Sequence, residues 1–197
     1  MSTTLKEYDS KFPLTSTDPL PILVNEFTES SGKSFCEEVI KRSIADENQP
    51  IIINIDSYGG YVDSLAQMLN TLDSINNPII TVCIGKAMSC GSILLSHGDY
   101  RFAAQHSRTM VHETLGGSKG NVNDILTSAE EMDRLNKHFM GVLAANCGKT
   151  LEELLPLMRG EKRDLYMDAK ASLDFGLIDY IGTPLVTKKT KFSLTTK

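Results

Sequence analysis

The stretch from Ile79 to Leu95, IITVCIGKAMSCGSILL, constrains the fold of this chain most strongly. An apolar run ends at Gly85, small residues follow, and a second apolar run begins at Ile93. This order predicts a buried strand that turns sharply into the first turns of a helix. Ser89 lies at the junction, where backbone amides lack partners and the helix dipole is positive. Its hydroxyl could cap the helix, or it could act as a nucleophile beside a site for an oxyanion.

Strands and helices alternate along the sequence. Ile51–Ile55 is a short β-branched run typical of a strand covered on both faces, and it leads into a turn with Gly59 and Gly60. Helical spacing of apolar residues follows before the strand that ends near Ser89. The alternation predicts an α/β fold with parallel strands. In such a sheet the glycine turn and Ser89 lie at the same end, where ligand sites occur.

Residues 121 to about 145 form the longest apolar-periodic segment. Helical rise makes such a helix on the order of 37 Å long, which is long for a small α/β domain. We therefore expect it to project from the core and to bury its apolar stripe against another subunit.

Helix-capping signals place several other helix ends. Ser34 with Glu37 three residues later predicts a capping box, and Thr150 with Glu153 predicts another. The first helix would carry an apolar side formed by Phe35, Val39, Ile40 and Ile44. A later helix is expected to begin after Asp168 and to end at Gly176, before a last strand at 177–181.

Composition limits the classes of partner. The chain has 197 residues, 41% of them hydrophobic, and a net charge of −5, which does not favour a nucleic-acid partner. Its four cysteines show neither a Cys-x-x-Cys motif nor metal-ligand spacing, so we expect no metal and a reducing compartment. No apolar run is long enough to cross a membrane, and the N-terminus carries no secretory signal. The chain is therefore expected in the cytoplasm, or in an organelle matrix or stroma.

The same features predict one domain at residues 20–183. Residues 1–19 lack hydrophobic periodicity, which predicts a flexible arm. Residues 184–197 are polar and are expected to form a flexible tail.

Two further residues complete a catalytic hypothesis. His112 ends the apolar strand that contains Met110, and it precedes a glycine-rich segment. Asp164 follows Arg163 and precedes a short extended piece. Each has a plain alternative, a hydrogen-bonded structural histidine and a surface ion pair. Together with Ser89 they form a Ser–His–Asp set of nucleophile, base and orienting acid.

Four ordered segments carry a family resemblance. They are IDSYGGYV, IGKAMSCGSILL, SRTMVHETLGG and RDLYMDAKASLDFGLIDYI. They resemble the family patterns I-N-S-P-G-G-x-V, I-G-Q-A-A-S-M-G-x-x-L-L, S-R-x-M-I-H-Q-P-L-G-G and R-D-x-x-M-S-A-x-E-A-x-x-Y-G-L-I-D-x-I. These are the patterns of the ClpP family, the proteolytic subunits of Clp proteases, and the similarity runs from about residue 51 to 181.

The resemblance implies a crotonase/ClpP-like fold of repeated ββα units with a protruding handle, here about residues 113–146. It implies a self-compartmentalising serine endopeptidase of two stacked heptameric rings that admits unfolded polypeptides. A Clp-family AAA+ ATPase would be the partner and would use the ATP, so the chain itself needs no cofactor. The implied residues are the triad Ser89, His112 and Asp164, the oxyanion donors Gly60 and Cys90, and the peptide-binding strand Leu115, Gly116 and Gly117. Arg163 would couple ring contact to the triad.

Some residues depart from the family pattern. Tyr58 replaces proline, Asp56 replaces asparagine, and Glu113-Thr114 replaces Gln-Pro. A carboxylate at Glu113 is expected to raise the pKa of His112. The region before Ile51 matches poorly, as in a divergent phage-, plasmid- or organelle-type member. Two alternatives remain open, an inactive structural subunit of a mixed ring and a crotonase-type acyl-CoA enzyme.

Overall fold

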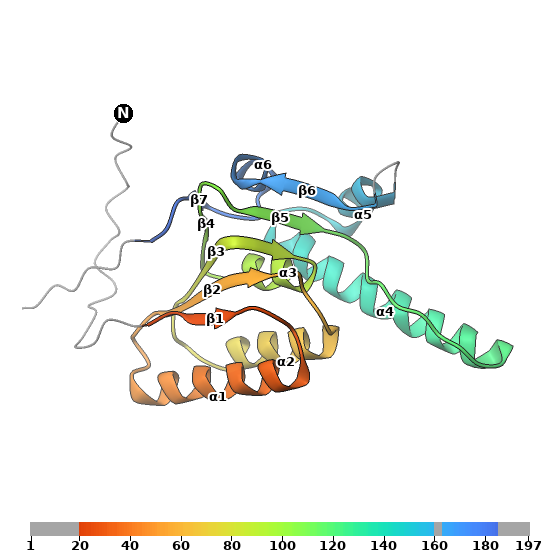
Figure 1. Ribbon diagram of the computed structural model, residues 1–197, viewed down its shortest axis with the longest axis horizontal. Coiled ribbons are helices and arrows are strands. Elements are labelled where there is room, and N and C mark those ends of the chain that lie inside the picture. Colours follow the sequence, from red (N-terminus) through yellow and green to blue (C-terminus); the bar gives the residue numbers. More distant parts are fainter. Residues whose placement is uncertain (1–19, 160–162, 185–197) are drawn as a thin grey trace, which may run out of the picture.

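The computed structural model describes residues 20–159 and 163–184, which form a mixed sheet packed with helices (Figure 1). The strands are β1 (Ile22–Val24), β2 (Ile51–Ser57), β3 (Ile79–Met88), β4 (Tyr100–Ala103), β5 (Arg108–Val111), β6 (Leu165–Asp168) and β7 (Tyr180–Ile181). The helices are α1 (Glu29–Ala45), α2 (Val62–Asp73), α3 (Cys90–Ser96), α4 (Val122–Asn146), α5 (Leu151–Arg159) and α6 (Ala169–Phe175). The expected arm and most of the expected tail, residues 1–19 and 185–197, lie outside the described residues.

Strand β3 is the branch point of the sheet. Its first half pairs with β4, and its second half pairs with β5. The main path runs β1-β2-β3-β4-β7 with parallel neighbours, and only the β5–β6 pair is antiparallel. The expected α/β class with parallel strands is confirmed. Because β2 and β3 are parallel, their carboxyl ends deliver the Gly59-Gly60 turn and Ser89 to one end of the sheet, as expected.

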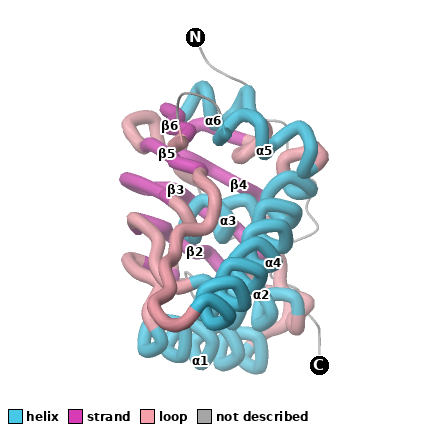
Figure 2. Tube along the Cα trace, turned by 90° about the vertical axis from the view of Figure 1, so that its right-hand side faces the viewer, coloured by secondary structure: helices cyan, strands magenta, loops and turns pink. Residues whose placement is uncertain are grey.

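The main hydrophobic core lies between the sheet and the helices that cover one of its faces (Figures 1 and 2). Alternate residues of a strand point to opposite faces. Ile51, Ile53 and Ile55 of β2 belong to this core together with apolar side chains of α1, α2 and α3. Ile52 instead belongs to a second, smaller cluster with Val82 and Phe102. The continuous β-branched run is thus buried on both faces, as its composition predicts.

Helix α4 extends beyond the body of the molecule (Figure 1). Its second half is rooted in the core through the buried residues Phe139, Met140, Leu143 and Ala144. Its first half carries the exposed apolar residues Val122, Ile125 and Leu126, which are 72%, 45% and 56% exposed. The apolar stripe expected along this helix is therefore buried in the second half of α4 and exposed in the first half, the outer part of α4.

The expected start of the first helix is wrong. Helix α1 begins at Glu29 because Thr28 forms a capping box with Ser31, each side chain hydrogen-bonding to the other residue's amide. Ser34 lies inside the helix. The expected apolar side is also wrong in part, since Ile40 is 45% and Ile44 81% exposed while Phe35 and Val39 are buried.

The later capping signals are confirmed. Thr150 and Glu153 form the predicted reciprocal pair at the start of α5. Asp168 accepts a hydrogen bond from the amide of Ala171, and Gly176 ends α6 with φ +87°. The last strand is shorter than expected, because only Tyr180–Ile181 pairs with β4. No helix in the described ranges has the length and apolar character needed to span a bilayer.

Candidate active site

Ser89 occupies a strained turn between β3 and α3. Its φ of 54° and ψ of −122° make it the one residue other than glycine with positive φ in the described parts of the chain. Such conformations cost about 1–3 kcal/mol for a non-glycine residue and concentrate at functional sites. Ser89 is the N-cap residue of α3, yet its side chain makes no capping hydrogen bond. Helix capping therefore does not account for the hydroxyl.

The glycine turn after β2 lies directly against Ser89. A Cβ placed on Gly59 would be 2.7 Å from the Cβ and 3.2 Å from the Oγ of Ser89, so only glycine permits this approach. A Cβ on Gly60 would lie 2.4 Å from the carbonyl oxygen of Phe27. The Tyr61 amide donates to that same oxygen at 2.8 Å, which fixes the turn against the segment after β1.

Cys90 contacts Gly60, the other residue expected to supply an oxyanion donor. Its buried thiol donates to the carbonyl oxygen of Gly60, with a sulfur-to-oxygen distance of 3.3 Å. Burial raises the pKa of the Cys90 thiol, and contacts with Gly60 and Ser89 oppose that rise. The thiol is therefore held protonated and works as a donor that fixes the turn beside Ser89.

His112 and Asp164 lie beside each other at the end of the β5–β6 pair. The last paired residues are Val111 and Leu165, so the next residues outward on the two strands are His112 and Asp164. The Nδ1 atom of His112 is 3.9 Å from Oδ1 of Asp164, which is ion-pair range but longer than a hydrogen bond. Burial lowers the pKa of His112, and the Asp164 carboxylate opposes this by raising it. The side chain of His112 is 11% exposed, and that of Asp164 is 44% exposed.

Strand pairing brings Ser89 into the neighbourhood of His112. Met88 pairs with Met110, and the amide of Ser89 donates to the Met110 carbonyl oxygen at 2.9 Å. His112 follows two residues later. Among the hydrogen bonds of the described residues, none joins the Ser89 hydroxyl to the His112 ring. Among the described residues, strand pairing thus gathers Ser89, His112 and Asp164 at one end of the sheet without hydrogen bonds between their side chains.

The expected effect of Glu113 on His112 is wrong. The pKa of His112 is lowered, and the groups that act on it are its own burial and Asp164. Glu113 is engaged elsewhere, because its Oε1 accepts from Arg159 Nη2 at 2.7 Å and from Asn136 Nδ2 at 2.9 Å. The hydrogen bond from Arg159 holds the pKa of Glu113 low. The charge of Glu113 is therefore balanced by Arg159, a pairing that the sequence motifs do not indicate.

The segment Leu115–Gly117 does not form a strand in this structure. Residues 112–119 adopt neither helix nor strand and run beside α4, as the loop in Figure 2 shows. Leu115 is 79% exposed, and a Cβ on Gly117 would meet no heavy atom within 4 Å. The segment is therefore exposed, and the expectation that it is already a strand is wrong.

Lys86 is a residue of this region that the motifs did not single out. Its Nζ lies 2.8 Å from Oδ1 of Asp56 and 4.5 Å from the centre of the Tyr58 ring. Asp56 and Tyr58 are the two departures in the glycine-turn motif, and Lys86 contacts both. The departures thus form one local cluster.

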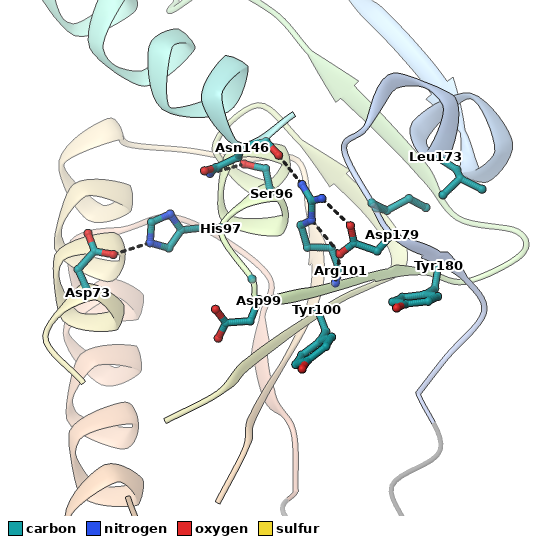
Figure 3. Close-up of a pocket in the computed structure, with 12 residues that line it drawn as sticks. Asp73, Ser96, His97, Asp99, Tyr100, Arg101, Asn146, Leu173, Asp179 and Tyr180 are labelled. Carbon is teal, nitrogen blue, oxygen red and sulfur yellow. Dashed lines mark hydrogen bonds and ion pairs between the residues drawn. The ribbon is translucent and has the colours of Figure 1, made fainter. Parts of the chain in front are cut away.

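A separate cavity of the described structure lies elsewhere. It has a volume of about 870 Å³ and is lined by residues around the end of α3 and the start of β4 (Figure 3). Asp99 in its wall accepts from the amide of Ile79, the first residue of β3, whereas Ser89 follows the last. A ten-residue strand spans roughly 30 Å, so the cavity and Ser89 are at opposite ends of the sheet.

Two pairs of side chains in this cavity, Arg101 with Asp179 and His97 with Asp73, contact each other (Figure 3). Arg101 donates to the Asp179 carboxylate and to the carbonyl oxygens of Asn146 and Gly176. His97 Nε2 lies 2.8 Å from Asp73 Oδ1. Arg101 therefore joins β4 to the ends of α4 and α6, which is a structural role.

A metal site finds no support in the donor set. Within residues 20–159 and 163–184, no group of three or more His, Cys, Asp or Glu side chains could hold a metal ion. Of the described cysteines, all four are free and buried.

A comparison with protein families identifies the class of this chain. The family model described as Clp protease matches residues 20–184, which is most of the chain. The match includes every motif on which the resemblance depends, and the mixed α/β architecture is consistent with the ClpP-like fold. The chain therefore belongs to the Clp protease family.

Proposed function

We propose that the chain is the catalytic subunit of a serine endopeptidase that cleaves unfolded polypeptides. The observation that carries the proposal is the conformation of Ser89. Its positive φ and a hydroxyl that does not cap the helix, beside a glycine turn that permits close approach, are the features of a nucleophile on a strand-to-helix turn.

The Ser89 hydroxyl would attack the scissile carbonyl carbon and pass its proton to Nε2 of His112. Asp164, on the Nδ1 side, would orient the ring and stabilise the imidazolium. His112 would then protonate the leaving amine, which breaks the C–N bond and leaves an acyl ester on Ser89. A water that gives its proton to His112 would hydrolyse this ester and restore the hydroxyl. The lowered pKa of His112 supports the role, since a base must be neutral before it accepts a proton.

The backbone amides of Gly60 and Cys90 would stabilise the oxyanion. Gly60 is exposed and held in place by its neighbours, and Cys90 is the first residue of α3, where amides have no intrahelical partner. The exposed segment Leu115–Gly117 would receive an extended peptide by strand addition. Recognition through the main chain suits substrates of varied sequence.

We infer that the subunits form two stacked heptameric rings joined through the handle. The exposed apolar residues of the outer part of α4 support a partner there. Enclosure would restrict substrates to unfolded chains, delivered by a Clp-family AAA+ ATPase. ATP would be used by that partner, and this chain would need no cofactor.

The test is labelling of the purified chain with a fluorophosphonate, with Ser89→Ala as the control. We expect labelling and cleavage of a fluorogenic peptide by the wild type, and neither by the variant. Electron microscopy with and without a Clp ATPase would report the ring number and the partner. An assembled wild type that neither labels nor cleaves would contradict the proposal and favour an inactive structural subunit of a mixed ring. The family match favours the active peptidase and the inactive structural subunit over an acyl-CoA enzyme.

A further inference from the structure

The chain just beyond His112 leaves the sheet, so the ladder hydrogen bonds of β5 do not hold it. The β5–β6 pairing ends at Val111 and Leu165, and residues 112–119 form no regular element. His112 and Asp164 thus both lie one step past the last paired residues. Contacts outside the sheet can therefore help to set the distance between them.

Two residues from helices hold this segment. Asn136 of α4, only 6% exposed, accepts from the Thr114 amide at 2.8 Å and donates to Glu113 at 2.9 Å. Arg159 donates to the same Glu113 oxygen through Nε at 3.0 Å and through Nη2 at 2.7 Å. Glu113 therefore receives three hydrogen bonds, two of them from the cationic guanidinium of Arg159.

Arg159 is the last residue of α5, and Asp164 follows five residues later. The Glu113–Arg159 pair therefore links the segment that follows His112 to the end of α5. We propose that Glu113 and Arg159 form a latch that positions His112 opposite Asp164, so that both are positioning residues. The proposal rests on the proposed function, in which His112 is the base.

The exposure of the Glu113 and Arg159 side chains distinguishes a positioning role from a role in overall stability. The side chains are 30% and 52% exposed, and ion pairs of this kind contribute little to the stability of a fold. A small displacement of a catalytic base, in contrast, lowers the rate strongly. Loss of the latch should therefore reduce turnover without unfolding the chain. It should leave KM unchanged if the latch acts on His112, and raise KM if it acts on the peptide-binding segment.

The experiment uses the full-length assembled protein and a short fluorogenic peptide. We expect Glu113→Gln, Glu113→Arg and Arg159→Glu each to lower kcat by about 10-fold, with KM within about 2-fold of wild type. The double variant E113R/R159E restores the pair with reversed charges and should return kcat to within about 3-fold of wild type. The matched control is Glu38→Gln on α1, which removes a carboxylate that also pairs with an arginine, Arg42, at 2.7 Å.

A set of variants as active as Glu38→Gln would overturn the latch, as would a rise in KM at constant kcat. Single variants with lowered kcat and no recovery in the double variant would also overturn it. If a charge-reversal variant fails to fold, Glu113→Gln alone still decides through its kcat and KM. A wild type without Ser89-dependent hydrolysis would overturn the proposed function and the latch with it, whereas an active wild type with unaffected variants would overturn the latch alone.

Discussion

The amide of Ser89 donates a hydrogen bond to the carbonyl oxygen of Met110 across 2.9 Å. This bond continues the parallel pairing of β3 and β5 by one step past Met88. It fixes the start of the strained turn to the strand that carries His112 two residues later. The sheet thereby places nucleophile and base from segments 23 positions apart in the sequence, 112 − 89 = 23.

Replacing Ser89 should separate catalysis from stability. Ser89→Ala and Ser89→Gly both remove the hydroxyl, so hydrolysis should fall about 10³-fold or more in each. Glycine also relieves the positive φ, worth about 1–3 kcal/mol, against an entropic cost of about 0.5–1 kcal/mol. Urea unfolding should therefore find Ser89→Gly more stable than Ser89→Ala. Equal stability of the two variants would show that the turn stores no strain.

The Gly60 position should tolerate no side chain. An alanine Cβ would lie 2.4 Å from the Phe27 carbonyl oxygen, at a φ of 153°. We expect Gly60→Ala to lower the free energy of unfolding by about 2–4 kcal/mol and to abolish hydrolysis. Gly117→Ala is the control, because no heavy atom lies within 4 Å of its Cβ, and its unfolding free energy should change by less than about 0.5 kcal/mol. A stable, active Gly60→Ala variant would contradict the proposed oxyanion turn.

The pH dependence of kcat/KM should follow the titration of His112. Burial lowers its pKa, so the acid limb of the wild type should have its midpoint below about 6.5. Asp164 raises this pKa; its removal in Asp164→Asn leaves burial unopposed and should move the limb to still lower pH. The rate should fall about 10²–10⁴-fold because the ring loses its orienting partner. Asp174→Asn on α6, where the carboxylate pairs with Lys170, should leave both rate and profile unchanged. An upward shift of the limb in Asp164→Asn would exclude the proposed pair.

Assembly should depend on the outer part of α4. Leu126 is 56% exposed, so Leu126→Lys removes no core contact and should change subunit stability by less than about 0.5 kcal/mol. A buried charge at a ring interface would instead lower the sedimenting mass of the assembly. Ile44→Lys on α1, at another exposed aliphatic residue, is the matched control and should assemble normally. If both variants sediment like the wild type, the handle is not the contact between rings.

Much of the fold could be predicted because local signals agree with tertiary packing. The run Ile51–Ile55 and the capping residues Thr150, Asp168 and Gly176 all behave as their chemistry predicts. The start of α1 could not be chosen from capping rules alone. Thr28 and Ser34 both offer a hydroxyl, and the usual rule favours Ser34 because Glu37 stands three residues later, whereas a serine, Ser31, completes the box with Thr28.

For the candidate site, the sequence predicts where the residues lie along the strands better than it predicts the charges around them. The sequence places Ser89, His112 and Asp164 at strand ends, and strand pairing gathers them at one end of the sheet. The charge of Glu113 could not be assigned to a partner, because Arg159 lies 46 residues away in the sequence. Long-range ion pairs of this kind need the tertiary fold.

The division of α4 has a consequence for how the gene can vary. A substitution at Phe139 or Leu143 acts on the folding of the subunit, since both are buried in its own core. One near Val122 or Ile125 leaves that core untouched and is felt only by whatever lies against the outer turns. Two different selection pressures therefore act on one helix, subunit folding on its second half and outer contacts on its first. A series of single substitutions along α4, each tested for subunit stability, would locate the boundary between them.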